Sequence, residues 1–195
     1  MRIRSSLAAL GMLASTPAFA HIGRGEAHDA MHGFLHPLTG LDHILAMVTV
    51  GALAAHLGGR ALWAVPAAFL AAMAVGGVLG MAGGAPPAID FVIAITVVAL
   101  GGMLAARIRA PTALAMGLVG LFAVAHGFAH GAELPEGASG LPYAFGFIAA
   151  TALLHASGVA AGLVASRSGA IGATAMRIGG LAVAVAGIAL MGSAL

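Results

Sequence analysis

The chain has 195 residues, of which 61% are hydrophobic and only 7% are charged, and its formal net charge at pH 7 is +2. This composition excludes an ordinary soluble domain and indicates an integral membrane protein. Nucleic acid is not expected as a partner, because the basic residues are scattered single arginines. The chain has no cysteine, which excludes disulfides, thiolate metal sites and cysteine nucleophiles.

Residues 1–20 have the pattern of a cleavable signal peptide. Arg2 and Arg4 precede a short apolar run, and Ala18-Phe19-Ala20 supplies the small residues that signal peptidase requires. An uncleaved anchor helix is the less favoured alternative, because the run is shorter than the roughly 18 residues that span a bilayer. Cleavage would leave His21 at the mature N-terminus, outside the cytoplasm.

The remaining residues, 21–195, are expected to form a single all-α transmembrane domain. A bilayer core takes about 20 apolar residues per helix. Six spans are predicted at about 37–57, 61–81, 86–106, 111–131, 141–165 and 171–195. Pro37 is expected at the first helical position of the first span, where its missing N–H costs little. The abundance of glycine and alanine predicts a compact helix bundle.

Arginines in the predicted loops give an independent indication of orientation. With the mature N-terminus outside, the inner loops and their borders hold Arg60, Arg107, Arg109, Arg167 and Arg177. The outer segments after the first span hold no arginine but do hold Glu133 and Glu136. Short cytoplasmic loops retain positive charge, so this distribution agrees with the signal peptide.

Ionisable residues within predicted spans cluster in the outer half of the membrane. Asp42 and His43 fall in the first two turns of the first span, and Asp90 begins the third. His126 and His130 lie in the last turns of the fourth span, and Glu133 follows. Such groups are costly in lipid, at roughly 2.5 to 3.5 kcal/mol each, so they normally mark a site or a pathway.

The spacing of these residues favours a metal site shared between two spans. His126 and His130 are one helical turn apart, which allows both imidazoles to bind one ion. His36 and His43 are about 10 Å apart along a straight helix, so they share an ion only if the chain bends at Pro37. The preferred ligands are therefore Asp42, His43, His126 and His130.

Histidines before the first span are expected to capture metal at the entrance. His28, His32 and His36 share one face if this segment is helical, and His21 lies upstream. The alternative is that these side chains are merely solvated. For any single histidine a hydrogen-bonded structural role is favoured, whereas the set favours a metal pathway.

Two further histidines lie deeper in the predicted bundle. His155 is about 20 Å into the fifth span, and His56 lies near the inner end of the first. Each is either a later station of a metal path or a polar contact between helices, and for His56 the structural role is favoured. Imidazole and carboxylate ligands suit Ni²⁺, Co²⁺, Zn²⁺ or Cu²⁺ without choosing among them.

Three segments resemble the signature segments of the HupE/UreJ family, membrane accessory proteins of nickel hydrogenases and ureases. They are HPLTGLDHILAM at 36–47, FAVAHGFAHGAELP at 122–135 and FIAATALLHASG at 147–158. The resemblance implies a permease for Ni²⁺ or Co²⁺ in the bacterial inner membrane, with no permanently bound cofactor. It places the metal site on His36, Asp42, His43, His126, His130 and Glu133. The first segment is also similar to the signature of larger nickel/cobalt transporters, but has one more residue between His36 and Asp42.

Two alternatives to transport remain open. A membrane accessory protein would sense or deliver the metal without moving it across the bilayer. Gly137-Ala138-Ser139-Gly140 matches a motif of intramembrane serine proteases, which need the serine and a histidine on different helices. Here Ser139 is expected in the outer loop before the fifth span, and the nearest downstream histidine, His155, is on that same span. No enzyme is therefore expected. The expected partners are the lipid bilayer and a divalent metal ion, and a homo-oligomer is left open.

Overall fold

The computed structural model describes residues 24–83, 86–134 and 140–194, and these ranges contain α-helices and no β-strand. The helices are α1 (Arg24–Thr39), α2 (Leu41–Leu57), α3 (Ala61–Gly83), α4 (Ile89–Ala105), α5 (Thr112–Ala132), α6 (Gly140–Arg167) and α7 (Gly169–Ser193). The all-α prediction is confirmed for this part of the chain. The predicted signal peptide, His21, Glu136 and Ser139 lie outside the described residues.

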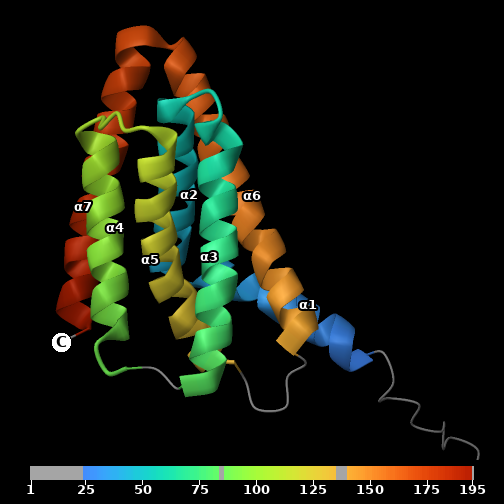
Figure 1. The fold of residues 1–195 in the computed structure, drawn as a ribbon. Helices are drawn as coiled ribbons and strands as arrows, with labels where there is room; N and C mark the ends of the chain where they lie inside the picture. Colours follow the sequence, from blue (N-terminus) through green and yellow to red (C-terminus); the bar gives the residue numbers. More distant parts are fainter. Residues whose placement is uncertain (1–23, 84–85, 135–139, 195) are drawn as a thin grey trace, which may run out of the picture.

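Helices α2 to α7 run alternately in opposite directions and form one bundle, with α1 at one end against α6 (Figure 1). The most extensive contacts join α3 with α5, α4 with α7, and α2 with α6. Fully buried apolar side chains from several helices, including Met47, Leu53, Phe69, Leu100 and Val119, form the core. Most other large apolar side chains face outward, as expected for helices that contact lipid.

Four helices, α3, α5, α6 and α7, are long and apolar enough to cross a membrane, and the bent pair α1–α2 counts as a fifth candidate. The four single helices begin and end within two residues of the predicted spans. Helix α4 is apolar but has only 17 residues. The chain is therefore a multi-pass membrane protein, and the six-span topology stays a prediction.

The predicted start of the first span is wrong. Pro37 lies inside α1, which continues to Thr39, and the chain then bends by 82° before α2 begins at Leu41. A proline lacks an N–H and its ring crowds the carbonyl four residues earlier, which disturbs a helix, yet α1 continues for two residues beyond Pro37. The break falls instead at Gly40, which has an extended backbone with φ −85° and ψ 119°.

Glycines let neighbouring helices approach closely beside the buried histidines. A Cβ atom on Gly127 would overlap the backbone carbonyl of Met73, so α5 lies directly against α3 next to His126. A Cβ on Gly51 would overlap the carbonyl of His155, so α2 lies directly against α6. Small residues are the usual means of such contacts between membrane helices.

The two ends of the bundle carry different charged side chains. Asp42, Asp90 and Glu133 lie at the end where α1 meets α2. Arg60, Arg107, Arg109 and Arg167 lie at the opposite end, in or next to the connections α2–α3, α4–α5 and α6–α7 (Figure 1). Because successive helices run in opposite directions, the predicted outer and inner loops lie at opposite ends of the molecule.

Candidate metal site

A cavity of about 230 Å³ opens at the acidic end of the bundle, between α1, α2, α4 and α5. Its polar lining residues come from all four helices or their ends: His36, Thr39, Asp42, His43, Asp90, His130 and Glu133. Five of the six ligands predicted from the sequence therefore line one cavity, and Asp90 joins them from the first turn of α4. His126 lies deeper and is fully buried.

The first group of ligands lies at the mouth of this cavity and comprises His36, His130 and Glu133. Each offers one ligand atom, and these atoms all lie within 4.8 Å of one another. The Glu133 carboxylate lies 3.5 Å from Nδ1 of His130 and 3.8 Å from Nε2 of His36. Glu133 is exposed, so this mouth group is open to the surroundings.

The second group of ligands is the inner group, Asp42, His43 and His126. Its ligand atoms also lie within 4.8 Å of one another. Asp42 Oδ2 lies 3.5 Å from Nδ1 of His43, and both imidazoles are buried. Nε2 of His43 and Nδ1 of His126 are buried without a hydrogen-bond partner in the described structure. Buried polar atoms are rarely left unpaired, so each is a free position for a ligand.

Thr96 on α4 sets the proton position on His126. Its hydroxyl donates to the carbonyl of Ile93 at 2.7 Å, so the Thr96 oxygen accepts from Nε2–H of His126 at 2.8 Å. The proton on Nε2 leaves the lone pair on Nδ1, the nitrogen without a partner. Metal-binding histidines are commonly oriented in this way. Sequence reasoning missed Thr96, because nothing in an apolar span relates it to a histidine thirty residues later.

His130 connects the mouth group to the inner group. Its Nδ1 lies 2.9 Å from Nε2 of His36, and its Nε2 lies 3.1 Å from Nδ1 of His43. One neutral arrangement satisfies these contacts: Nδ1–H of His43 donates to His130, and Nδ1–H of His130 donates toward His36 and Glu133. This arrangement leaves the lone pair of His43 on Nε2, its unpaired nitrogen.

Electrostatics at the mouth favour a cation. The hydrogen bond with the His130 side chain is the main cause that lowers the pKa of Glu133 below its usual value. The carboxylate therefore stays ionised under mildly acidic conditions. Asp42 and Asp90 line the same cavity, which places three carboxylates beside the imidazoles. Carboxylate and imidazole together suit a divalent transition metal.

The structure divides the predicted ligands differently from the sequence analysis. His126 and His130 were expected to share one ion, but His130 belongs to the mouth group and His126 to the inner group. His36 was expected at the entrance, separate from His43. The 82° bend instead brings both side chains to opposite nitrogens of His130.

Comparison with known proteins identifies the family of the chain. The family model described as HupE / UreJ protein matches residues 8–190. The chain belongs to the HupE/UreJ family. It is 46% identical over 190 residues to Protein HupE of Rhizobium leguminosarum bv. viciae, and the match covers 97% of each chain. No solved structure matches the chain significantly.

In this HupE/UreJ-family protein, the histidines of α1 form a row that leads to the mouth group. The ring centroids of His28 and His32 are 6.4 Å apart, and those of His32 and His36 are 6.5 Å apart. The segment is helical, so these three side chains share one face as predicted. His28 and His32 are both exposed. Metal capture by this row stays a prediction.

His155 lies beyond the inner group, inside the bundle. The ring of Phe69 packs against an imidazole of each, with its centroid 6.0 Å from that of His126 and 5.0 Å from that of His155. Both ring nitrogens of His155 are buried and have no hydrogen-bond partner in the described structure. The alternative role of a hydrogen-bonded contact between helices therefore has no bond to support it.

His56 is placed differently. Its Nε2–H donates to the carbonyl oxygen of Arg107 at 3.1 Å, at the arginine-rich end of the bundle. This bond joins the end of α2 to the α4–α5 connection, which is the structural role favoured from the sequence.

Proposed function

We propose that this HupE/UreJ-family protein is a permease that carries Ni²⁺ or Co²⁺ across the bacterial inner membrane to supply a nickel enzyme such as hydrogenase or urease. Two adjoining groups of imidazole and carboxylate ligands in an apolar helix bundle carry the proposal. The full topology in the proposal has six spans, with α1–α2 as the first and α4 as the third. A cleaved signal peptide would leave the N-terminus on the periplasmic side.

The two groups support a stepwise loss of water from the metal ion. The mouth group includes the exposed Glu133, so a hydrated ion reaches it first. The inner group lies around buried imidazoles, where ligand atoms replace the remaining water. His130 has one ring nitrogen toward each group, so turning its ring transfers the ion over a short distance. Imidazole is a weaker ligand than thiolate for such ions, so an ion bound by imidazoles can be released to the next site.

The inward path in this proposal continues from His126 to His155. The ring of Phe69 packs against both imidazoles, so in this proposal the ion advances when a movement of the helices displaces that ring. The unpaired nitrogens of His155 are then the next ligands. Transporters without an open pore generally work by alternating access, in which movements of the helices open the site to one side of the membrane at a time.

Uptake of radioactive Ni²⁺ into proteoliposomes tests the proposal. The variants are His43→Ala and His130→Ala, with Ser157→Ala as the control, because Ser157 is exposed on α6 and bonds only within its own helix. We expect uptake by the wild type and the control, and a loss of at least tenfold in both histidine variants. Equal accumulation in all four proteins would refute transport through this site. Nickel binding without uptake by the wild type would favour an accessory protein that does not transport.

A further inference from the structure

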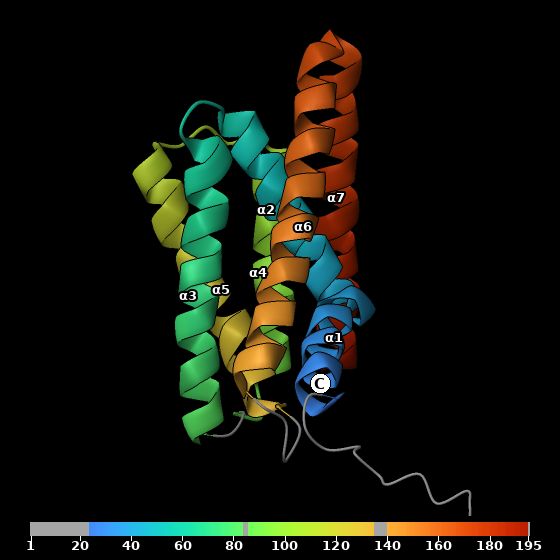
Figure 2. The same cartoon turned by 90° about the vertical axis from the view of Figure 1, so that its right-hand side faces the viewer.

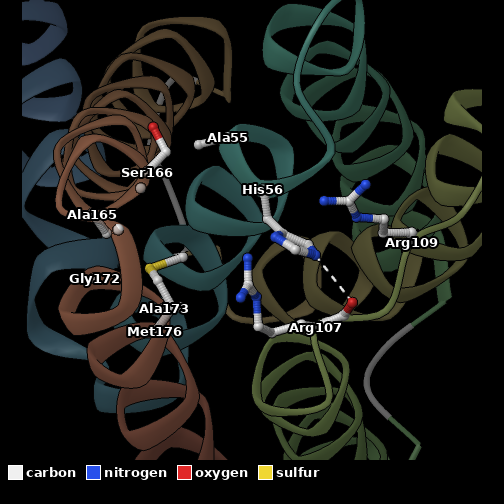
Figure 3. Close-up of a pocket in the computed structure, with 11 residues that line it drawn as sticks. Ala55, His56, Arg107, Arg109, Ala165, Ser166, Gly172, Ala173 and Met176 are labelled. Atoms are coloured by element: carbon white, nitrogen blue, oxygen red, sulfur yellow. Dashed lines mark hydrogen bonds between the residues drawn. The ribbon is translucent and has the colours of Figure 1, made fainter.

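A second cavity, of about 260 Å³, lies at the arginine-rich end of the bundle, opposite the metal site. The end of α2, the α4–α5 connection and the two arms of the α6–α7 hairpin enclose it, as Figure 3 shows. Its polar side chains are His56, Arg107, Arg109 and Ser166. No acidic residue is part of its lining.

The two arginines give this cavity a positive charge that nothing in the described structure neutralises. Neither guanidinium is paired with a carboxylate within the described residues. In the view of Figure 3 the ring of His56 lies between the two guanidinium groups. Two cations that face one cavity repel each other, and the repulsion falls when an anion binds between them.

The backbone holds the first of these arginines in place. Arg107 has φ +53°, a conformation that costs a residue with a side chain roughly 1 to 3 kcal/mol, so it persists only where its surroundings fix it. The hydrogen bond from His56 to the Arg107 carbonyl is one such constraint. The cavity is therefore built by interactions that join α2 to the α4–α5 connection.

The N-terminus of α7 adds a third positive element. Gly169 and Gly172, in its first turn, line the cavity. The N-cap residue Ser168 makes no side-chain cap, and its hydroxyl donates to the carbonyl of Val164. The first N–H groups of α7 therefore remain available to an acceptor, and a helix N-terminus favours a negative charge.

We propose that this cavity binds a phosphate-bearing anion between Arg107, Arg109 and the N-terminus of α7. Arginine suits phosphate because its planar fork donates two parallel hydrogen bonds. The source is either the headgroup of an anionic phospholipid or a soluble phosphate. The α6–α7 hairpin projects beyond the other helices at this end of the bundle (Figure 2), and both of its arms line the cavity. This inference is independent of nickel transport.

Binding to the full-length protein purified in detergent tests the proposal. Native mass spectrometry measures adducts with phosphatidylglycerol and with phosphatidylcholine. Thermal unfolding in inorganic phosphate, against chloride at equal ionic strength, measures the soluble source. If the anion is a lipid headgroup, we expect phosphatidylglycerol adducts to form at a concentration at least about fivefold lower than phosphatidylcholine adducts. If it is a soluble phosphate, we expect phosphate alone to raise the melting temperature. The first result identifies a lipid headgroup and the second a soluble phosphate.

The variants are Arg109→Gln alone and together with Arg107→Asn, because asparagine tolerates positive φ better than most residues. Arg60→Gln is the matched control, since Arg60 is exposed at the same end but outside this cavity. Each cavity arginine removed should weaken binding about fivefold, and the control should not. If the double variant fails to fold, Arg109→Gln decides alone. The proposal is overturned if the wild type shows neither preference, or if the cavity variants bind as well as Arg60→Gln.

Discussion

His130 is a member of the mouth group, and its two ring nitrogens contact His36 and His43, so its side chain links the mouth group to the inner group. Removing it should separate them, whereas removing His36 affects only the mouth. We therefore expect His130→Ala to lower Ni²⁺ uptake at least tenfold more than His36→Ala at a low metal concentration. Raising the Ni²⁺ concentration should restore the His36 variant but not the His130 variant. Equal recovery of both would contradict a bridging role.

Thr96 offers a test of the inner group that leaves every ligand in place. Thr96→Val keeps the shape of the side chain but removes the oxygen that accepts from Nε2–H of His126. Loss of such a partner commonly lowers metal affinity by about 10- to 100-fold. Thr96→Ser keeps the hydroxyl and should bind nickel as the wild type does. Isothermal titration of Ni²⁺ distinguishes the two, and equal affinity would exclude an orienting role for the hydroxyl.

Protons compete with the metal for imidazole, so acid should weaken uptake. The lowered pKa of Glu133 keeps its carboxylate ionised as the pH falls, so the histidines and not Glu133 should set the acid limit. We expect Ni²⁺ uptake to fall as the pH drops through and below about 6.5. Glu133→Gln should reduce uptake at every pH, because it removes a carboxylate ligand from the mouth group. Uptake that falls only below about pH 4.5, where carboxylates titrate, would contradict this assignment to the histidines.

At the scale of helices, the bend between α1 and α2 determines how many ligands meet. Gly40 permits it by leaving room for its neighbour, since a Cβ atom there would lie 2.8 Å from Oδ1 of Asp42. Gly40→Ala should displace this carboxylate and lower nickel affinity. Stability should change little, because φ −85° is accessible to alanine. Gly102→Ala is the control, since nothing lies within 4 Å of that position. Equal nickel affinity in the two variants would show that the metal site does not depend on a glycine at position 40.

The sequence predicts the helices well because hydropathy and length decide them, and α3, α5, α6 and α7 follow the predicted spans closely. The sequence also indicates the candidate ligands, because ionisable residues within membrane spans are costly and normally mark a functional site. The angle between α1 and α2 is not predictable in this way. Pro37 and Gly40 both disturb a helix, and only tertiary packing decides where the chain turns.

The division of ligands between two groups was equally hidden in the sequence. His126 and His130 share one helix face, so their spacing alone suggests a common ion. Their side chains turn to different partners because Thr96 on α4 holds His126, while His36 on α1 meets His130. These partners come from segments that the sequence does not place side by side. Rotations of side chains thus depend on contacts between helices, which no local pattern records.

At the scale of the whole molecule, the bundle separates a cation site from an anion-suited cavity. Carboxylates and imidazoles line the cavity at one end, and unpaired arginines line the cavity at the other. A divalent cation is attracted to the first end and repelled from the second. In the proposed transport, an anion bound near Arg107 and Arg109 would reduce the repulsion that an ion meets as it leaves the bundle. The anion proposal does not rest on nickel transport, and each of the two proposals is tested separately.

His155 lies between these two ends, and its substitution tests whether Ni²⁺ binding at the mouth and Ni²⁺ uptake depend on different residues. Its buried nitrogens have no hydrogen-bond partner, so replacing it with leucine removes an unsatisfied polar group while filling a similar volume. If the role of His155 were packing alone, His155→Leu should be stabilised by about 1 kcal/mol or more with normal uptake. If His155 is a station on the path, the same variant should be stabilised and should bind Ni²⁺ at the mouth, yet uptake should fall at least tenfold. Thermal unfolding, equilibrium Ni²⁺ binding and uptake on one preparation decide between these outcomes, and we expect the second.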